Sequence, residues 1–278
     1  MRVLIGIMLL AYATASATAP RWHWEGRFSE QEKAGLSDWI EQVLHGMTTL
    51  LGEPSDTFHV HFVHRSSDEP VPWGETNKGR GRRAYLHVDT RYPWTAFVQD
   101  WTAPHELSHL LFPYLGEDSR WFAEGIASYL QYQIMYASGV LSWEQVIARY
   151  DDRFRSARAG SRFGDMSIVE HSRRASSSGY VRLYWGGAAY FLQADRQLYL
   201  AHGTRLTDVI RKYAVCCYQP WGVDADGMIN QFDRLSGGTV FAKTYARTVA
   251  RPGFPDTAEA LEWLQQHPPL QLQRSGSS

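Results

Sequence analysis

The sequence predicts an α+β fold in which a small region with a mixed β-sheet, residues 20–94, precedes a mainly helical region, residues 95–270. Two segments of the first region, FHVHFVHR (58–65) and AYLHVDT (84–90), alternate apolar and polar residues as strands do. From about residue 95 onward, apolar residues recur at helical spacing instead. Because no repeat or linker divides residues 20–278, we expect a single domain that ends in a flexible tail, residues 271–278.

The composition indicates a globular protein. The 278 residues include 44% hydrophobic and 21% charged residues, and the formal net charge is −1. A nucleic-acid-binding protein usually shows a strong basic excess, so this balance argues against a nucleic-acid partner. The basic stretch KGRGRR (78–83) is short, and we interpret it as a solvated loop.

The first residues have the layout of a cleavable signal peptide. In MRVLIGIMLLAYATASATAP one Arg precedes an apolar run and then small residues, with Ala-x-Ala patterns that end at Ala17 and at Ala19. We expect residues 1–19 to be this signal and the protein to be exported, either periplasmic or secreted. The alternative is a buried N-terminal strand. Neither the apolar run nor any later segment is long enough for a membrane-spanning helix.

Elements are predicted in order along the chain. A helix begins at Ser29, with Glu32 as its capping-box partner, and ends at Gly52 and Pro54. The strand at 58–65 follows, then a polar loop rich in Pro and Gly through residue 82, then the strand at 84–90. Residues 142–154 and 204–215 are amphipathic and predict helices, whereas residues 155–180, rich in Arg, Ser and Gly, predict a long loop.

The stretch HELSH, residues 105–109, predicts a metal site. His105 and His109 lie four residues apart, so on a helix both imidazoles face the same side and can reach one metal ion. Glu106, beside the first ligand, is placed to act as general base for a water that the metal activates. Pro104 suits the first turn of such a helix.

A catalytic zinc ion needs a third protein ligand and an open position. Glu124 is the best candidate, because it is the one carboxylate in the strongly apolar stretch RWFAEGIASYLQYQIMY. The alternative is that Glu124 caps the helix or pairs with Arg120. Ser128, one helical turn later, is a candidate hydrogen-bond partner within the site.

HELSH followed by WFAEGIASY resembles the gluzincin metallopeptidases, specifically the catalytic core of the glycyl aminopeptidase and aminopeptidase N families. Trp121, Gly125, Ala127 and Tyr129 match the family pattern around Glu124. The resemblance implies a thermolysin-like core, one Zn²⁺ per chain held by His105, His109 and Glu124, and a peptide or protein substrate. It covers roughly residues 100–200.

A second match implies the tyrosine that hydrogen-bonds the oxyanion. The stretch 184–199, YWGGAAYFLQADRQLY, resembles the Y-x-K-G segment of both families, which implies this role for Tyr184. Tyr180 and Tyr190 are rival candidates. The chain departs from the pattern in three ways: the spacing from His109 to Glu124 is shorter, Gly186 replaces the Lys, and the elements that hold a free amine, G-x-M-E-N and G-L-E-H, are missing.

The remaining histidines and cysteines carry weaker signals. His59 and His61 share one face of a strand, next to His64, and a second metal site there would need another ligand. We interpret His87 as structural and expect its strand, 84–90, to line the cleft as an edge. Cys216 and Cys217 are adjacent, and disulfides prefer more widely separated Cα atoms, so we expect two partly buried thiols, with a redox role as the alternative.

Together these observations predict an exported zinc metallopeptidase with Glu106 and Tyr184 as catalytic residues. Two other functions fit the same residues. The fold can serve as a catalytically silent binding module of the cell envelope, with a structural zinc ion. The zinc centre can also act as an amidase on cell-wall peptide. An intact Glu106 argues against the silent module, because a structural zinc site has no use for a base and is usually closed by four ligands.

Overall fold

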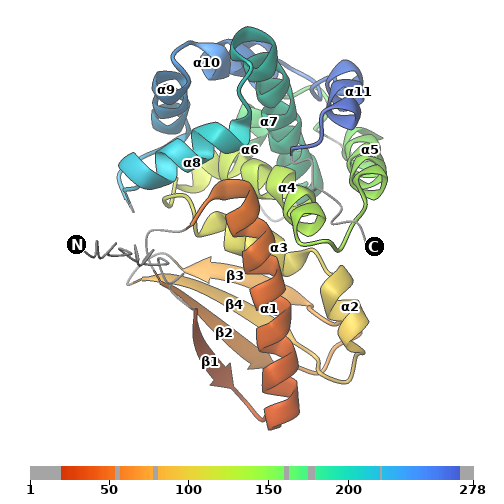
Figure 1. Ribbon diagram of the computed structural model, residues 1–278. Coiled ribbons are helices and arrows are strands. Elements are labelled where there is room, and N and C mark those ends of the chain that lie inside the picture. Colours follow the sequence, from red (N-terminus) through yellow and green to blue (C-terminus); the bar gives the residue numbers. More distant parts are fainter. Residues whose placement is uncertain are drawn as a thin grey trace, which may run out of the picture.

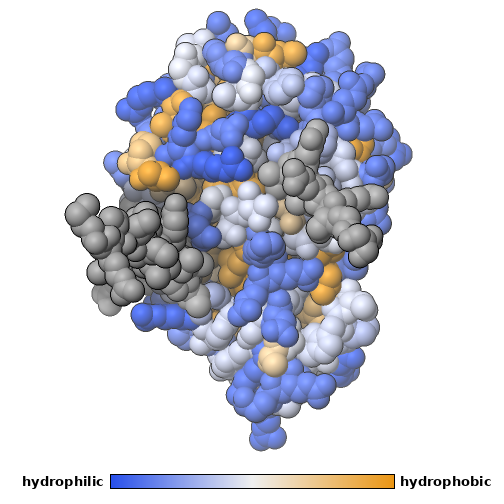
Figure 2. All heavy atoms as spheres, in the orientation of Figure 1, coloured by the Kyte–Doolittle hydropathy of each residue, from blue (hydrophilic) through white to orange (hydrophobic). Residues whose placement is uncertain are grey.

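The strands come first in the chain and most of the helices follow them (Figure 1). The computed structural model describes residues 20–53, 57–77, 81–159, 163–174, 179–219 and 221–269. The predicted signal peptide, 1–19, and the predicted tail, 271–278, lie outside these described residues. No helix in the described part of the chain is long and apolar enough to cross a membrane. Figure 2 shows one face of the molecule, which is mainly hydrophilic with small separate hydrophobic patches.

The four strands form one mixed sheet, as the sequence predicts. Their order across the sheet is β1 (Arg21–Glu25), β2 (Phe58–His64), β4 (Arg82–Val88) and β3 (Trp73–Asn77). The pairs β1–β2 and β2–β4 are parallel, whereas β3 runs antiparallel to β4. β3 is therefore an edge strand. It is the strand of the sheet that lies nearest the helical region (Figure 1).

The expectation that residues 84–90 form an edge strand is wrong. β4 lies between β2 and β3, and its alternate side chains are fully buried, as an internal strand requires. The edge belongs to β3, whose sequence WGETN lies in the stretch that predicts a loop. This strand contains one Gly and three polar residues, so it lacks the alternating apolar signal that marks β2 and β4.

Helix α1 (Glu30–Leu51) covers one face of the sheet (Figure 1). Its predicted capping box is confirmed: the Ser29 hydroxyl accepts a hydrogen bond from the Glu32 backbone N–H at 3.3 Å, and the Glu32 carboxylate accepts one from the Ser29 N–H at 2.7 Å. Its apolar side packs into the same buried cluster as the inward residues of β2 and β4. That cluster includes Leu36, Trp39, Ile40, Val43, Phe58, Val60, Phe62, Ala84, Leu86 and Val88.

The remaining helices build the second part of the molecule. They are α2 (Trp94–Gln99), α3 (Thr102–His109), the 3-10 turn η1 (Glu117–Ser119), α4 (Arg120–Ala137), α5 (Trp143–Ala159), α6 (Ile168–Arg174), α7 (Tyr180–His202), α8 (Leu206–Cys216), α9 (Ala225–Ser236), α10 (Val240–Arg247) and α11 (Ala258–Gln266). The prediction of a loop over 155–180 is wrong in part, because α5 extends to residue 159 and α6 lies within it. Buried Ala157, Ile168 and Val169 stabilise these helical turns despite their charged neighbours.

Two glycines allow α4 and α7 to lie in close contact. A Cβ atom at Gly187 would lie 2.0 Å from the carbonyl oxygen of Trp121, and one at Gly125 would lie 2.5 Å from the backbone of Gly187. No other residue fits at either position without moving a helix. This contact brings the first turns of α7 beside the first turns of α4.

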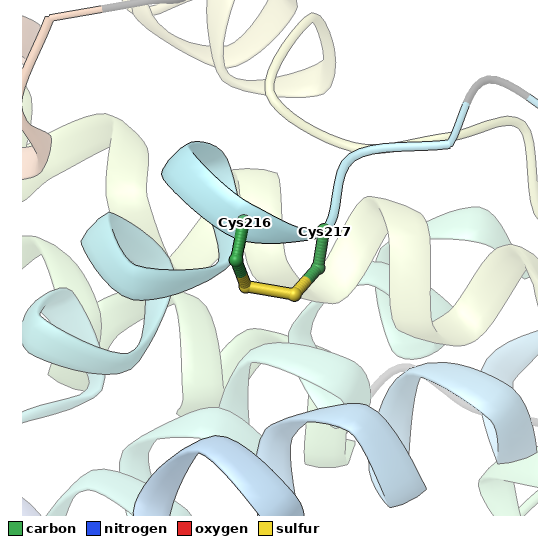
Figure 3. The surroundings of a disulfide bond; sticks show 2 residues. All are labelled: Cys216 and Cys217. Carbon is green, nitrogen blue, oxygen red and sulfur yellow. A yellow bond between two sulfur atoms is a disulfide. The ribbon is translucent and has the colours of Figure 1, made fainter.

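Cys216 and Cys217 form a disulfide at the end of α8, with their Cα atoms 3.7 Å apart (Figure 3). The expectation of two free thiols is therefore wrong. The helix ends at this point, and Cys217 has left helical geometry with φ −140° and ψ 7°. The N–H of Cys217 still bonds to the carbonyl of Tyr213 at 3.0 Å, but its φ and ψ depart from helical values, and the two side chains turn toward each other.

Candidate metal centre

The two histidines of HELSH converge as the spacing predicts. Both lie on α3, where His105 is 2% and His109 is 6% exposed, and their Nε2 atoms are 3.2 Å apart. At the start of this helix the Asp100 carboxylate accepts a hydrogen bond from the Thr102 N–H at 2.7 Å. The helix is short and buried along its whole length, so its orientation is fixed by packing.

Glu124 completes the cluster from the second turn of α4. Its Oε2 atom lies 3.1 Å from Nε2 of His105 and 3.3 Å from Nε2 of His109. The loop and 3-10 turn between α3 and α4 reverse the chain, so that Glu124 faces back toward α3. Within the described residues, these three form the one group of His, Cys, Asp and Glu side chains that could hold a metal ion.

Charge interactions dominate inside this cluster. Burial by itself would raise the pKa of Glu124, but the neighbouring His109 and His105 outweigh it and hold the pKa well below its usual range. Burial by itself would lower the pKa of His105, and the Glu124 carboxylate outweighs this effect and raises it. The carboxylate is therefore ionised in the site, which is the form that binds a metal ion.

The geometry of the three atoms fits zinc. A tetrahedral zinc ion with ligand distances of about 2.0–2.1 Å holds its ligand atoms about 3.3 Å from one another. The three separations here are 3.1, 3.2 and 3.3 Å. Two imidazoles and one carboxylate are also the ligand set of many catalytic zinc sites, in which a fourth position stays open.

A buried glutamine orients the first histidine. Oε1 of Gln131, which is 2% exposed, accepts a hydrogen bond from Nδ1 of His105 at 2.9 Å. This bond fixes the proton on Nδ1 and directs the lone pair of Nε2 toward the other ligands. The expected partner Ser128 is buried on α4 but does not hold this position. The signal for Gln131 is its spacing, since it lies two helical turns after Glu124.

Glu106 faces the cleft beside the cluster and is 9% exposed. It packs directly against the edge strand: a Cβ atom at Gly74 of β3 would lie 2.6 Å from Cγ of Glu106 and 2.6 Å from Cγ2 of Thr102. A glycine is therefore needed for β3 to approach α3 this closely. The sequence provides no clear signal for this role of Gly74.

Tyr184 is the candidate tyrosine that lies at the cluster. Its ring stacks on that of His105, with centroids 5.9 Å apart, and it lines the cleft together with Glu124. Burial, followed by the charges of Glu124 and Glu106, raises the pKa of Tyr184 well above its usual value. The hydroxyl thus stays protonated and remains a hydrogen-bond donor.

The two rival tyrosines lie elsewhere. Tyr180 is 37% exposed, and its hydroxyl accepts a hydrogen bond from Arg120 at 3.4 Å. Tyr190 is buried and donates its hydroxyl proton to the carbonyl of Phe241 at 3.3 Å. At Gly186, where the family pattern has Lys, a Cβ atom would lie 2.4 Å from the side chain of Ile168, so α6 occupies the space of a longer residue.

An open cleft of about 460 Å³ runs past the cluster. All five residues of β3 line it, together with residues 114–117, Arg120, Ala123 and Trp221. Glu106, His109, Glu124 and Tyr184 lie at its base. The edge strand and the candidate metal ligands therefore face the same solvent-accessible cleft.

The other histidines of the strands do not form a second metal cluster in the described part of the chain. On β1 and β2, His23 stacks on His61 with ring centroids 4.2 Å apart and hydrogen-bonds His59 at 2.9 Å. His61 also hydrogen-bonds Glu25 at 3.2 Å. The Arg65 guanidinium donates a hydrogen bond to His87 at 3.2 Å. These histidines bond to one another and to neighbouring side chains on the face of the sheet opposite α1.

Comparison with known proteins supports the fold. No family model matches the chain, and no curated protein matches its sequence. Among solved structures, an aminopeptidase N family protein from Idiomarina loihiensis superposes with a TM-score of 0.63 at 16% identity, covering 86% of this chain and 46% of that one. An M1 zinc metallopeptidase from Deinococcus radiodurans superposes with a TM-score of 0.51 at 14% identity, covering 84% and 49%.

The chain thus spans about half the length of these two proteins. At such low identities the likeness shows the fold alone, which is that of part of an aminopeptidase N family structure. The predicted resemblance to zinc metallopeptidases of this type is confirmed at the level of the fold.

Proposed function

We propose that the chain is an exported zinc-dependent peptidase, in which His105, His109 and Glu124 hold the metal ion and Glu106 is the general base. The convergence of the three ligand atoms at the base of an open cleft carries this proposal. The similar fold of a zinc metallopeptidase from Deinococcus radiodurans supports it. Export is supported by the apolar and small residues at positions 3–19, and by a disulfide, which persists in oxidising compartments.

When bound, zinc supplies a Lewis acid that polarises the scissile carbonyl and increases the acidity of water. The carboxylate of Glu106 accepts a proton from the attacking water and delivers it to the leaving nitrogen. The hydroxyl of Tyr184, protonated because its pKa is raised, donates a hydrogen bond to the substrate oxygen as charge develops there. Gln131 holds the ring of His105 in the orientation that metal binding needs.

The edge strand gives the substrate class a physical basis. Among the described residues β3 pairs with β4 alone, so the outer edge of residues 73–76 is where an extended peptide would add to the sheet. Because Gly74 has no side chain, a peptide bound along β3 lies close to Glu106. The described residues offer three protein ligands to a metal ion, which supports a catalytic role for it, because a structural zinc ion would usually be held by four.

The test replaces Glu106 with Gln and measures both zinc content and hydrolysis of a fluorogenic peptide library. We expect Glu106→Gln to keep its zinc and to lose kcat by about 10²–10⁴-fold, the contribution of a general base. Glu170→Gln is the matched control, because Glu170 lies in an exposed ion pair with Arg174 on α6. A Glu106→Gln variant with full activity would disprove the mechanism. Cleavage of cell-wall peptide amides alone would favour the amidase.

A further inference from the structure

The segment between α8 and α9, of which residues 217–219 and 221–224 are described, contributes Trp221 to the lining of the cleft. Trp221 lies in this segment, is 52% exposed and lines the cleft. It is the one cleft residue that the described chain contributes after α7. Its indole therefore faces the space that an extended substrate on β3 would occupy.

The segment is anchored on both sides of Trp221. At its start, the N–H of Cys217 donates to the carbonyl of Tyr213 at 3.0 Å, and the guanidinium of Arg82 lies 3.8 Å from the ring centroid of Tyr218. At its end, the N–H of Ala225 donates to the hydroxyl of Ser119 at 3.0 Å. Trp221 is thus held between a contact to β4 and a contact to the start of α4.

The disulfide lies at the start of this segment (Figure 3). It closes a small ring that includes the peptide bond between Cys216 and Cys217, so both residues lose backbone freedom. Cys217 packs against the core, whereas Cys216 is exposed and can be reached by another thiol. Opening the ring would free the backbone at the point where the chain leaves α8 for the cleft.

We propose that the Cys216–Cys217 disulfide positions Trp221 as a substrate-contacting wall of the cleft, and that a dithiol reductant releases it. In that step a thiolate of the reductant attacks the sulfur of Cys216, the more exposed residue of the pair, and forms a mixed disulfide, which the second thiol of the reductant resolves. The S–S bond of the protein breaks, two S–H groups form, and the reductant is oxidised to its own disulfide. Two electrons and two protons pass from the reductant to the protein.

The experiment compares oxidised protein with protein reduced by a phosphine, which, unlike a small dithiol, does not chelate zinc. Peptide hydrolysis and intrinsic tryptophan emission are measured for wild type, Cys216→Ser/Cys217→Ser, Trp221→Ala and Trp73→Ala. Trp73 is the matched control because it is an exposed tryptophan of the same cleft on β3. Zinc content is measured in every sample.

We expect reduction to raise KM for wild type about 2- to 12-fold, the range for the ordering of one large side chain, with kcat and zinc content unchanged. The double Ser variant should already have the raised KM, and Trp221→Ala should not respond to reduction. Reduction should change the tryptophan emission of wild type and of Trp73→Ala but not of Trp221→Ala.

Only the KM readout rests on the proposed function, so the emission change tests the positioning of Trp221 even if no peptide is cleaved. Unchanged emission after full reduction of wild type, or an equal change in Trp221→Ala, would overturn the proposal.

Discussion

Gln131 and His105 form a buried hydrogen bond of 2.9 Å between the amide oxygen and Nδ1. Both side chains are 2% exposed, so neither can exchange this partner for bulk water. Because Gln131 and Glu124 lie on the same helix, α4 supplies both a candidate ligand and the group that orients a second ligand. The position of one helix thereby sets the geometry of two of the three ligands.

Replacing Gln131 with Leu should weaken zinc binding by about 10- to 100-fold, the usual effect of removing such a partner. The physical reason is that Nδ1 of His105 loses its acceptor and the ring loses its fixed orientation. Competition with a fluorescent zinc chelator measures the change. Ser128→Ala is the matched control on the same helix and should bind zinc as wild type does. Equal zinc affinity of Gln131→Leu and wild type would show that the hydrogen bond does not orient the ligand.

Gly74→Ala should lower kcat by about 100-fold, as expected when a catalytic group is displaced by about 1 Å. A Cβ atom at this position would lie 2.6 Å from Cγ of Glu106, so either β3 or Glu106 must move. Steady-state kinetics with a fluorogenic peptide gives kcat, and elemental analysis should find the zinc retained. Wild-type kcat in this variant would mean that the contact between β3 and Glu106 does not position the base.

Tyr184→Phe should lower kcat by about 10²–10³-fold, the effect of removing one oxyanion donor, and leave zinc content unchanged. Tyr180→Phe serves as the control, because the Tyr180 hydroxyl bonds to Arg120 and not to the cluster. It should retain most of the wild-type kcat. The reverse pattern, with Tyr180→Phe inactive and Tyr184→Phe active, would assign the role to Tyr180.

Asp195 forms a buried network that ties α4 and α7 to the start of α8. Its carboxylate accepts hydrogen bonds from the hydroxyl of Tyr129 at 2.8 Å, from Arg205 at 2.7 Å and from the N–H of Leu206 at 2.7 Å. Asp195→Asn should lower the free energy of unfolding by about 3–5 kcal/mol, because it leaves the Arg205 charge buried without its partner.

Urea unfolding measures this difference, with Asp151→Asn as the control. Asp151 pairs with Arg155 on an exposed helix surface, and its loss should change the free energy by less than about 1 kcal/mol. Similar values for both variants would show that the buried network adds nothing beyond an exposed ion pair.

Features that depend on local pattern were predictable from the sequence. The capping box of Ser29 and Glu32 starts α1, and the alternation of β2 and β4 places their apolar side chains against it. His105 and His109 face the same side because side chains four residues apart lie on the same face of a helix, about one turn apart. Fold class and the candidate ligands follow from such local rules together with the family resemblance.

Features that depend on tertiary contact were not predictable. β3 is a strand because β4 pairs with it and α3 packs on Gly74, not because WGETN favours a strand. Gln131 belongs to the site because α4 lies beside α3. Its spacing from Glu124 fits a partner of His105, but so does the spacing of Ser128, and the sequence does not favour either residue. The disulfide depends on where α8 ends, which the cysteine spacing does not specify.

The most direct test of the central claim is the zinc content of purified wild type, Glu124→Ala and the control Glu170→Ala, measured by elemental analysis. We predict one zinc ion per chain in wild type and in Glu170→Ala, and its loss in Glu124→Ala. A well-folded wild type that binds no zinc after zinc is added would contradict the account. A Glu124→Ala variant that keeps a full zinc ion at unchanged affinity would contradict the three-ligand site.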